Sequence, residues 1–519
     1  MPTPASRYDS VPYPSYTHPQ THPNRLAVIG TLAGLKPAPP AHCRVLEIGC
    51  GDASNLVPMA WTLPGSEFVG LDLAALPIAK GQEAIQALGL RNLRLVQADL
   101  AAVNGEWGKF DYIIAHGLFS WVPPEIRERL LALCRSLLAP HGIAFVSYNA
   151  LPGGHMRAML REMMLFHVRA YESPEERIEQ ARALTQFLLQ GQLPAQEHRG
   201  WFKAELESVL EHHPRYLYHD HLGEINEPYY FTQFIERAAA HGLQYLSEAD
   251  YFEMSAHMFP QPVQAVLGQL SGNRIQREQY LDFLKCRRFR QTLLCHAELP
   301  LRSEPDAADV TRFAVLSPAR RTSEEARLAP GITCVFQAAN GFRCETDFPL
   351  GKAALSVLCP LCPTSLTFDD LLARSLKALQ NESISWSDDS EARVQLAGFL
   401  LKVYSVGLVD FRATQPQVAT QVTEQPVASA LARWQSLHGN SVTSLFHMTV
   451  QIEDEIGKSL LQWLDGTADR KVLLEKLWTF LNEKQALITD GGVESARTAL
   501  ESQLDANLQK LARMGLLMK

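Results

Sequence analysis

The stretch that decides the fold is Val45-Leu-Glu-Ile-Gly-Cys-Gly-Asp-Ala53. Its first four residues are typical of a strand, and the glycines that follow are typical of a tight turn leading into a helix. Gly49 and Gly51 allow the backbone to approach a ligand closely, and the N-terminus of the next helix offers amide groups to an acceptor. The third glycine of a G-x-G-x-x-G motif is missing because residue 54 is Ser. This departure weakens the case for a dinucleotide site.

Short apolar runs on both sides of this turn alternate with amphipathic stretches. This alternation is the pattern of repeated βαβ units and predicts an α/β fold with a doubly wound, Rossmann-like, mostly parallel sheet. The expected strands are 44–48, 67–71, 93–97, 112–115 and 143–148, with helices at 76–88 and 125–138 between them.

Acidic residues end the second and third expected strands. Asp72 follows Glu47 at a distance that suits an acid accepting hydrogen bonds from both ribose hydroxyls. Asp99 ends the third strand, where it can accept from an exocyclic adenine amine. Together with the glycine turn, these acids predict a nucleoside-containing ligand across the carboxyl edge of the sheet. An NAD-linked dehydrogenase on the same fold is the alternative.

Glu47-Ile-Gly-Cys-Gly51, Asp72 and Asp99 resemble motifs I, II and III of class I S-adenosylmethionine-dependent methyltransferases. The resemblance implies a seven-stranded sheet and S-adenosylmethionine as the cofactor. It also implies that the glycine turn lies against the methionine moiety, that Asp72 binds the ribose and that Asp99 approaches the adenine. The expected cofactor-binding residues are Glu47, Gly49, Cys50, Gly51, Asn55, Asp72, Leu73, Asp99, Leu100 and His116.

A narrower resemblance is to a bacterial subgroup that joins this domain to a methyltransferase regulatory domain, which residues 278–291 resemble. The subgroup includes rickettsial protein lysine methyltransferases that act on outer-membrane proteins. It implies methyl transfer to a nitrogen acceptor, with protein lysine favoured. A small-molecule or natural-product methyltransferase and a non-catalytic S-adenosylmethionine-binding regulatory protein are the alternatives. The segments that carry the resemblance are 8–15, 55–59, 116–123 and 148–153.

Four side chains are candidates for the chemistry. The loop that begins at His116 follows the fourth strand, where aromatic faces can stabilise a cation. Tyr148 and Asn149 end the fifth strand and offer a hydroxyl and an amide to an acceptor nitrogen. A lysine acceptor must first lose its proton, and Tyr148, His116 and Tyr13 are candidates to assist. The expected catalytic residues are therefore Tyr13, His116, Tyr148 and Asn149.

The remaining sequence suggests several further units. The first forty residues are rich in Pro, Tyr and His and predict an extended flap with aromatic anchors. Asn340-Gly341 between two apolar runs predicts a hairpin, and three helical stretches after it suggest a winged-helix-like module. The expected divisions are 1–40 (flap), 41–155 (catalytic domain), 156–305 (helical regulatory or dimerisation domain), 306–330 (linker), 331–415 (winged-helix-like module) and 416–519 (C-terminal helical domain).

Composition limits the partners. A net charge of -8 predicts no general attraction to nucleic acid, and no apolar run is long enough to predict membrane insertion. Nine scattered cysteines indicate reduced thiols and a cytoplasmic protein. Neither the set Cys334, Cys344, Cys359 and Cys362 nor the histidine-rich segment 212–221 has metal-ligand spacing, so no metal is expected. The expected partners are a protein or small-molecule substrate and a possible second copy of the chain.

Overall fold

A seven-stranded sheet forms the centre of the computed structural model, which describes residues 7–11, 13, 15–191, 200–324, 327–386, 388–419, 421–484 and 493–518. The strand order is β3-β2-β1-β4-β5-β7-β6. All neighbours are parallel except at β7, which runs antiparallel to both β5 and β6. The predicted doubly wound, mostly parallel sheet is therefore confirmed. The strands are β1 Arg44–Ile48, β2 Glu67–Asp72, β3 Leu93–Gln97, β4 Phe110–Ala115, β5 Leu138–Asn149, β6 Leu243–Glu248 and β7 Phe289–His296.

The order of the strands places a ligand crevice at the end of β1. This strand pairs with β2 on one side and with β4 on the other, both in parallel. The chain therefore winds in opposite directions from β1, and the loops after β1 and β4 separate at the carboxyl edge. The glycine turn at residues 49–51 lies at that point.

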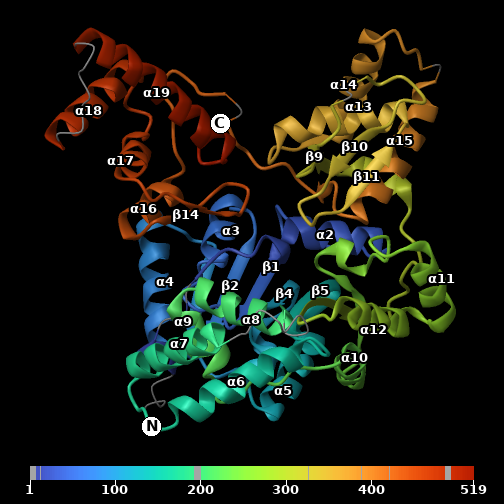
Figure 1. The fold of residues 1–519 in the computed structure, drawn as a ribbon, viewed down its shortest axis with the longest axis vertical. Helices are drawn as coiled ribbons and strands as arrows, with labels where there is room; N and C mark the ends of the chain where they lie inside the picture. Colours follow the sequence, from blue (N-terminus) through green and yellow to red (C-terminus); the bar gives the residue numbers. More distant parts are fainter. Residues whose placement is uncertain are drawn as a thin grey trace.

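Two apolar layers sandwich the sheet because successive side chains of each strand point to opposite faces. Leu46 and Ile48 pack in one core with apolar residues of α5 and α10, whereas Val45 packs in the other with α2, α3 and α4. Figure 1 shows α2, α3 and α4 near β1 and β2, with α5 on the far side. The covering helices are α2 Pro23–Leu32, α3 Leu56–Thr62, α4 Ala75–Leu88, α5 Pro124–Leu137 and α10 Phe231–Ala240.

The segment 156–305, which the sequence predicted to be mainly helical, also supplies β6 and β7. The sheet thus extends past the predicted boundary at residue 155. The predicted cap of one of its helices is present, since the Ser173 hydroxyl accepts a hydrogen bond from the Glu176 amide at 3.4 Å. The helices here are α6 Gly154–Val168, α7 Pro174–Gln190, α8 Gly200–Glu211, α9 Pro214–Tyr216, the π-helix η6 Leu217–His221, α11 Gln261–Leu270 and α12 Arg274–Lys285.

Two further lobes lie above the sheet in Figure 1. In the first, Gly341 has φ +87° in the turn between β10 and β11, at the predicted hairpin. The expected linker at 306–330 instead contributes β8 and β9 to two small sheets. Its elements are β8 Ala314–Leu316, β9 Arg320–Arg321, β10 Cys334–Gln337, β11 Arg343–Thr346, α13 Pro349–Leu358, β12 Leu366–Thr367, α14 Phe368–Asn381, α15 Asp389–Tyr404 and β13 Asp410–Arg412.

The second lobe is the C-terminal part of the chain. A short hairpin, β14–β15, joins helices that pack around one apolar core. The lobe touches the catalytic sheet through α16, which packs on α4. Its elements are α16 Ala430–His438, β14 Ser441–Thr443, β15 Thr449–Gln451, α17 Glu455–Trp463, α18 Arg470–Glu483 and α19 Val493–Arg513.

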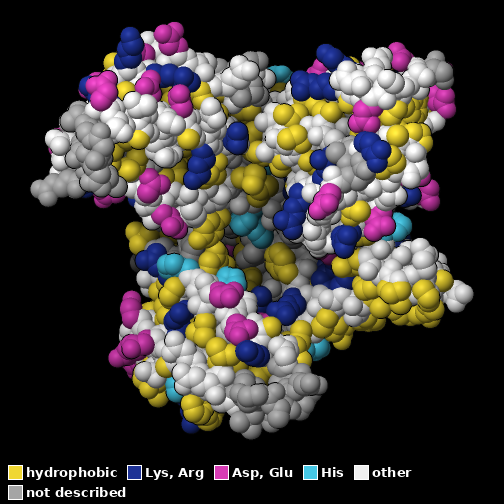
Figure 2. Space-filling model, turned by 45° about the horizontal axis from the view of Figure 1, so that its top comes forward, with side chains coloured by type: hydrophobic (Ala, Val, Ile, Leu, Met, Phe, Trp, Pro, Cys, Tyr) yellow, Lys and Arg dark blue, Asp and Glu magenta, His cyan; other side chains and the backbone are white. Residues whose placement is uncertain are grey.

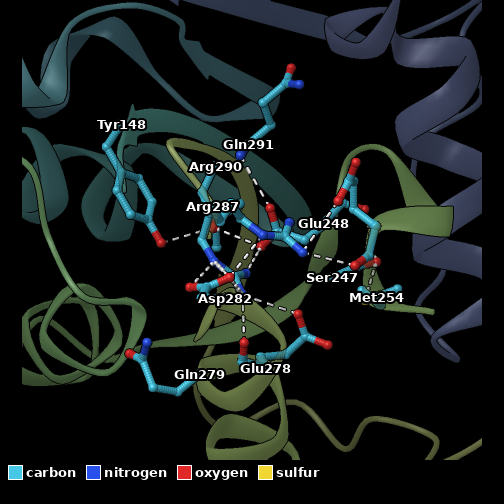
Figure 3. Close-up of polar contacts among 12 residues, drawn as sticks. Tyr148, Ser247, Glu248, Met254, Glu278, Gln279, Asp282, Arg287, Arg290 and Gln291 are labelled. Atoms are coloured by element: carbon cyan, nitrogen blue, oxygen red, sulfur yellow. Dashed lines mark hydrogen bonds and ion pairs between the residues drawn. The ribbon is translucent and has the colours of Figure 1, made fainter. Parts of the chain in front are cut away.

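A buried ion cluster holds β6, β7 and α12 together (Figure 3). The guanidinium of Arg290 on β7 lies 2.5 Å from a carboxylate oxygen of Glu248 and 2.8 Å from one of Asp282. It also lies 3.9 Å from the ring centroid of Phe231. These side chains are completely or almost completely buried, so removing the cation would leave carboxylates buried without compensation.

We expect Arg290→Gln to lower the free energy of unfolding by ~3–5 kcal/mol, the cost of breaking a buried ion pair from one side. Denaturant unfolding followed by tryptophan fluorescence measures this change. Arg312→Gln is the matched control, because its ion pair with Asp309 lies at the surface, and we expect a change below about 1 kcal/mol. Equal effects of the two substitutions would contradict the assignment.

Candidate functional site

The turn after β1 is shaped for a ligand. Gly49 and Gly51 have φ of +77° and +55°, in the region that favours glycine. The Gly49 and Cys50 amides donate to the Leu71 carbonyl at 2.8 and 3.0 Å, which ties the turn to β2. A Cβ atom added to Gly51 would meet nothing within 4 Å, so the turn has open space beside it. Cys50 is buried, and its Sγ lies 3.8 Å from the Gly51 carbonyl oxygen within the turn.

Asp72, at the end of β2, holds the turn from the other side. One carboxylate oxygen accepts from the Gly51 amide at 2.8 Å, and the other accepts from the Ala74 amide at 2.9 Å. Burial raises the pKa of Asp72, and the amide hydrogen bonds oppose that shift. Each oxygen keeps a second lone pair for a hydroxyl donor. The arrangement therefore fits the expected ribose role.

The two residues that follow Asp72 and Asp99 differ in exposure. Leu73 is 44% exposed, whereas Leu100 is buried. Asp99 is exposed, and its carboxylate accepts from the Ala101 amide at 2.8 Å. It therefore caps a short helix and leaves its second oxygen available at the edge of the sheet, as an adenine contact requires.

Glu47 is the buried acid of the site. Asn55 donates to one of its oxygens at 2.9 Å, while the other oxygen is buried and has no hydrogen-bond partner among the residues that the structure describes. Burial raises the pKa of Glu47 to about 8, and the Asn55 hydrogen bond opposes the shift. A buried acceptor that lacks a partner fits a site made for a ligand or for a bound proton.

Asn55 joins three distant parts of the chain at this turn. Its side-chain amide also donates to the Thr21 hydroxyl at 3.0 Å. Its oxygen accepts from the His18 backbone amide at 3.0 Å and from the His447 ring at 2.9 Å. The N-terminal arm and the C-terminal lobe therefore both contact the start of α3, beside the glycine turn.

His116 lies in a chain of neutral side chains. One ring nitrogen is 2.9 Å from the Ser147 hydroxyl, and the other is 3.0 Å from the ring of His18. Burial lowers the pKa of His116 far below its ordinary value and lowers that of His18 to about 4. Both ring nitrogens of His116 are engaged, so the residue anchors the arm over the edge of β4. Figure 2 shows histidine side chains around the hollow between the lower and upper parts of the molecule.

The structure does not support a role for Tyr148 in methyl transfer. Its side chain is 1% exposed and stacks on Phe234, with ring centroids 4.1 Å apart. Its hydroxyl lies 3.2 Å from that of Thr292, toward the Arg290 cluster (Figure 3). Burial raises the pKa of Tyr148 well above the ordinary value.

Asn149 and Tyr13 lie at the carboxyl edge. The Asn149 amide donates to the Asn226 side chain at 2.9 Å. Tyr13 is 40% exposed, and its hydroxyl donates to Asp220 at 3.3 Å. The structure thus brings the cofactor candidates, His116, Asn149 and the arm to one edge, and excludes the Tyr148 side chain from it.

The sequence analysis missed several groups at this site. Asp52 is buried and lies 2.5 Å from the Lys80 ammonium, and it accepts from Ser54 at 2.6 Å. The Asp-x-Ser spacing is a local turn signal that could have identified the contact between Asp52 and Ser54. His447 had no such signal, because it is 392 residues away from Asn55 in the sequence.

Comparisons with known proteins agree with this geometry. Residues 45–142 match a methyltransferase domain model, 213–296 a predicted methyltransferase regulatory domain, and 424–516 the C-terminal winged-helix domain of PKMT. An uncharacterized protein of Rickettsia prowazekii is 30% identical over 98% of this chain and 93% of its own length. The chain belongs to the class I S-adenosylmethionine-dependent methyltransferases. S-adenosylmethionine is its cofactor.

Other relatives of this methyltransferase are also rickettsial. A second uncharacterized Rickettsia prowazekii protein is 38% identical over 44% of this chain and 93% of its own length. The structure of PKMT2 from Rickettsia typhi in complex with AdoHcy matches with a TM-score of 0.86 at 28% identity, over 98% of this chain and all of that one. The winged-helix match lies at 424–516, one unit later than the predicted 331–415.

Asp72→Ala in this methyltransferase should raise the Kd for AdoHcy by about 100-fold or more. The substitution removes the two hydrogen bonds that we expect between the ribose hydroxyls and the Asp72 carboxylate, and a hydrogen bond to a charged group is worth ~1.5–3 kcal/mol. Isothermal titration calorimetry measures the change. Glu67→Ala on the same strand is the control, since the Glu67 side chain is exposed and forms a surface ion pair with Arg44. An unchanged affinity of Asp72→Ala would refute the ribose assignment.

Glu47 predicts a pH dependence. Because its folded pKa of about 8 exceeds the unfolded value of about 4.3, the folded chain holds an extra proton between these limits. Glu47 therefore contributes less stability as the pH rises through this window. The free energy of unfolding of the Glu47→Gln chain should therefore rise relative to that of the parent chain by up to ~1.4 kcal/mol per pH unit between pH 5 and 7. Denaturant unfolding at each pH measures this, and a difference that does not vary with pH would contradict it.

Proposed function

We propose that this methyltransferase modifies lysine side chains of a protein. The observation that carries the proposal is the match to PKMT2 of Rickettsia typhi, which covers nearly the whole chain and not only the catalytic sheet. The match to the C-terminal winged-helix domain of PKMT supports it independently. A protein acceptor is consistent with a chain in which two lobes stand above the carboxyl edge of the sheet (Figure 1).

The residues at the carboxyl edge of the sheet would position the cofactor and the acceptor and exclude water from them. When bound, S-adenosylmethionine supplies a methyl group on a positively charged sulfur. Gly49, Gly51, Asp72 and Asp99 would hold the methionine, ribose and adenine parts of the cofactor. The arm at residues 15–22 lies across the start of α3 and shields the edge from solvent. Alignment of two reactants in this way provides ~7–11 kcal/mol in favourable cases.

The location and assembly of the chain stay predictions from the sequence. No helix among the described residues has the length and apolarity to cross a membrane. We propose that the enzyme works in the cytoplasm on a protein substrate and that two copies of the chain form a homodimer, which light scattering would detect as twice the mass of one chain.

The proposal is tested with labelled S-adenosylmethionine and an outer-membrane protein fraction from a Gram-negative bacterium. We expect label in protein bands and a 14-dalton increment on lysine residues by mass spectrometry. The Asp72→Ala chain is the control, because its impaired cofactor site should give no label. Label found only in small molecules, or on residues other than lysine, would contradict the proposal.

A further inference from the structure

Three tyrosines and one carboxylate gather beside the cofactor site. Tyr13 from the arm meets Tyr216 of α9 edge-on, with ring centroids 5.1 Å apart. Tyr16 lies parallel to Tyr216 at 6.3 Å. The Tyr13 hydroxyl donates to Asp220 of η6 at 3.3 Å. We call these four residues the tyrosine–aspartate cluster. Two of them, Tyr216 and Asp220, belong to the histidine-rich segment 212–221, to which the sequence analysis assigned no function.

Within the described parts of the chain, Asp220 has no cation in direct contact with its carboxylate. Among the described residues, no Lys, Arg or His forms an ion pair with it, although Arg157 lies near enough to act through space. Arg157 instead approaches Glu205, with a nitrogen–oxygen distance of 3.8 Å. Burial raises the pKa of Asp220 to about 6, and Arg157, the Tyr13 hydroxyl and His212 oppose that shift. A carboxylate in this position is stabilised by any cation that enters beside it.

The cluster lies between two parts of the cofactor edge. Ser15, between the two arm tyrosines, lies close enough to Asp52 of the glycine turn for its hydroxyl to help lower the pKa of that carboxyl. On the other side, the Asp220 carbonyl accepts from Asn226 at 3.3 Å, and Asn226 accepts from Asn149 at the end of β5. A group bound at the cluster would therefore be close to the ends of both β1 and β5.

We propose that the tyrosine–aspartate cluster receives the ammonium group of the acceptor lysine, with Asp220 as its counter-ion and the tyrosine rings around it. Aromatic faces attract cations, and the carboxylate selects a charged amine over a neutral side chain of similar length. The inference rests on the proposed lysine activity, since it names the site that selects that acceptor. The N-terminal arm supplies two of the four residues, Tyr13 and Tyr16. The arm would therefore both select the substrate and shield the bound cofactor from solvent.

Asp220→Asn tests the assignment, because it keeps the shape of the side chain and an acceptor for Tyr13 while removing the charge. The probe is the outer-membrane protein fraction with labelled S-adenosylmethionine. We expect the half-saturating concentration of the fraction to rise about tenfold or more, while the Kd for AdoHcy stays within about twofold. Glu211→Gln is the matched control, since Glu211 is an exposed acid at the end of α8, and should leave both quantities unchanged.

The outcomes separate the two claims. If the parent chain labels lysine and Asp220→Asn does so with the parent's half-saturation, the cluster assignment is overturned and the proposed function stands. If the parent chain labels no lysine, both fall. If Asp220→Asn loses AdoHcy binding as well, the residue supports the fold or the cofactor, and the assignment is again overturned. Tyr216→Phe should retain most of the activity and Tyr216→Ala should not, because the aromatic ring is what the proposal requires.

Discussion

The hydrogen bonds that the half-buried Asp72 and the buried Glu47 make with the turn after β1 and with the start of α3 are the constraint on which the site depends. Asp72 accepts from the Gly51 amide and Glu47 accepts from the Asn55 side chain. Together with the Gly49 and Cys50 amides, which donate to the Leu71 carbonyl, these contacts tie the turn to β2 and to the start of α3. They therefore fix a turn whose glycines adopt positive φ at the carboxyl edge of the sheet.

Segments far from the catalytic sheet in the sequence contact it beside this turn, through Asn55. Asn55 binds the arm through Thr21 and the backbone of His18, and it binds the C-terminal lobe through His447. Burial lowers the pKa of His447 far below its ordinary value, so the contact is between neutral groups and survives at neutral pH. Segments from both ends of the sequence therefore meet at Asn55, beside the predicted cofactor site.

The sequence predicted well what local pattern determines. Strand β1 and the turn follow from apolar residues and two glycines, and the structure has β1 and β3 at the predicted residues. The sequence did not predict the elements whose structure depends on contacts with distant parts of the chain. Strands β6 and β7 lie within a helical segment, and they join the sheet by pairing with each other and, through β7, with β5. The burial of Tyr148 against Phe234 also follows from tertiary packing, because neighbouring side chains of a strand point to opposite faces and the sequence does not show which face this one takes.

The most direct test of the account is a crystal structure of the chain with AdoHcy bound. The account predicts ribose hydroxyls within hydrogen-bond distance of the Asp72 carboxylate, the adenine amine near Asp99 and the homocysteine part along Gly49 and Gly51. AdoHcy bound elsewhere, or with its ribose away from Asp72, would contradict it.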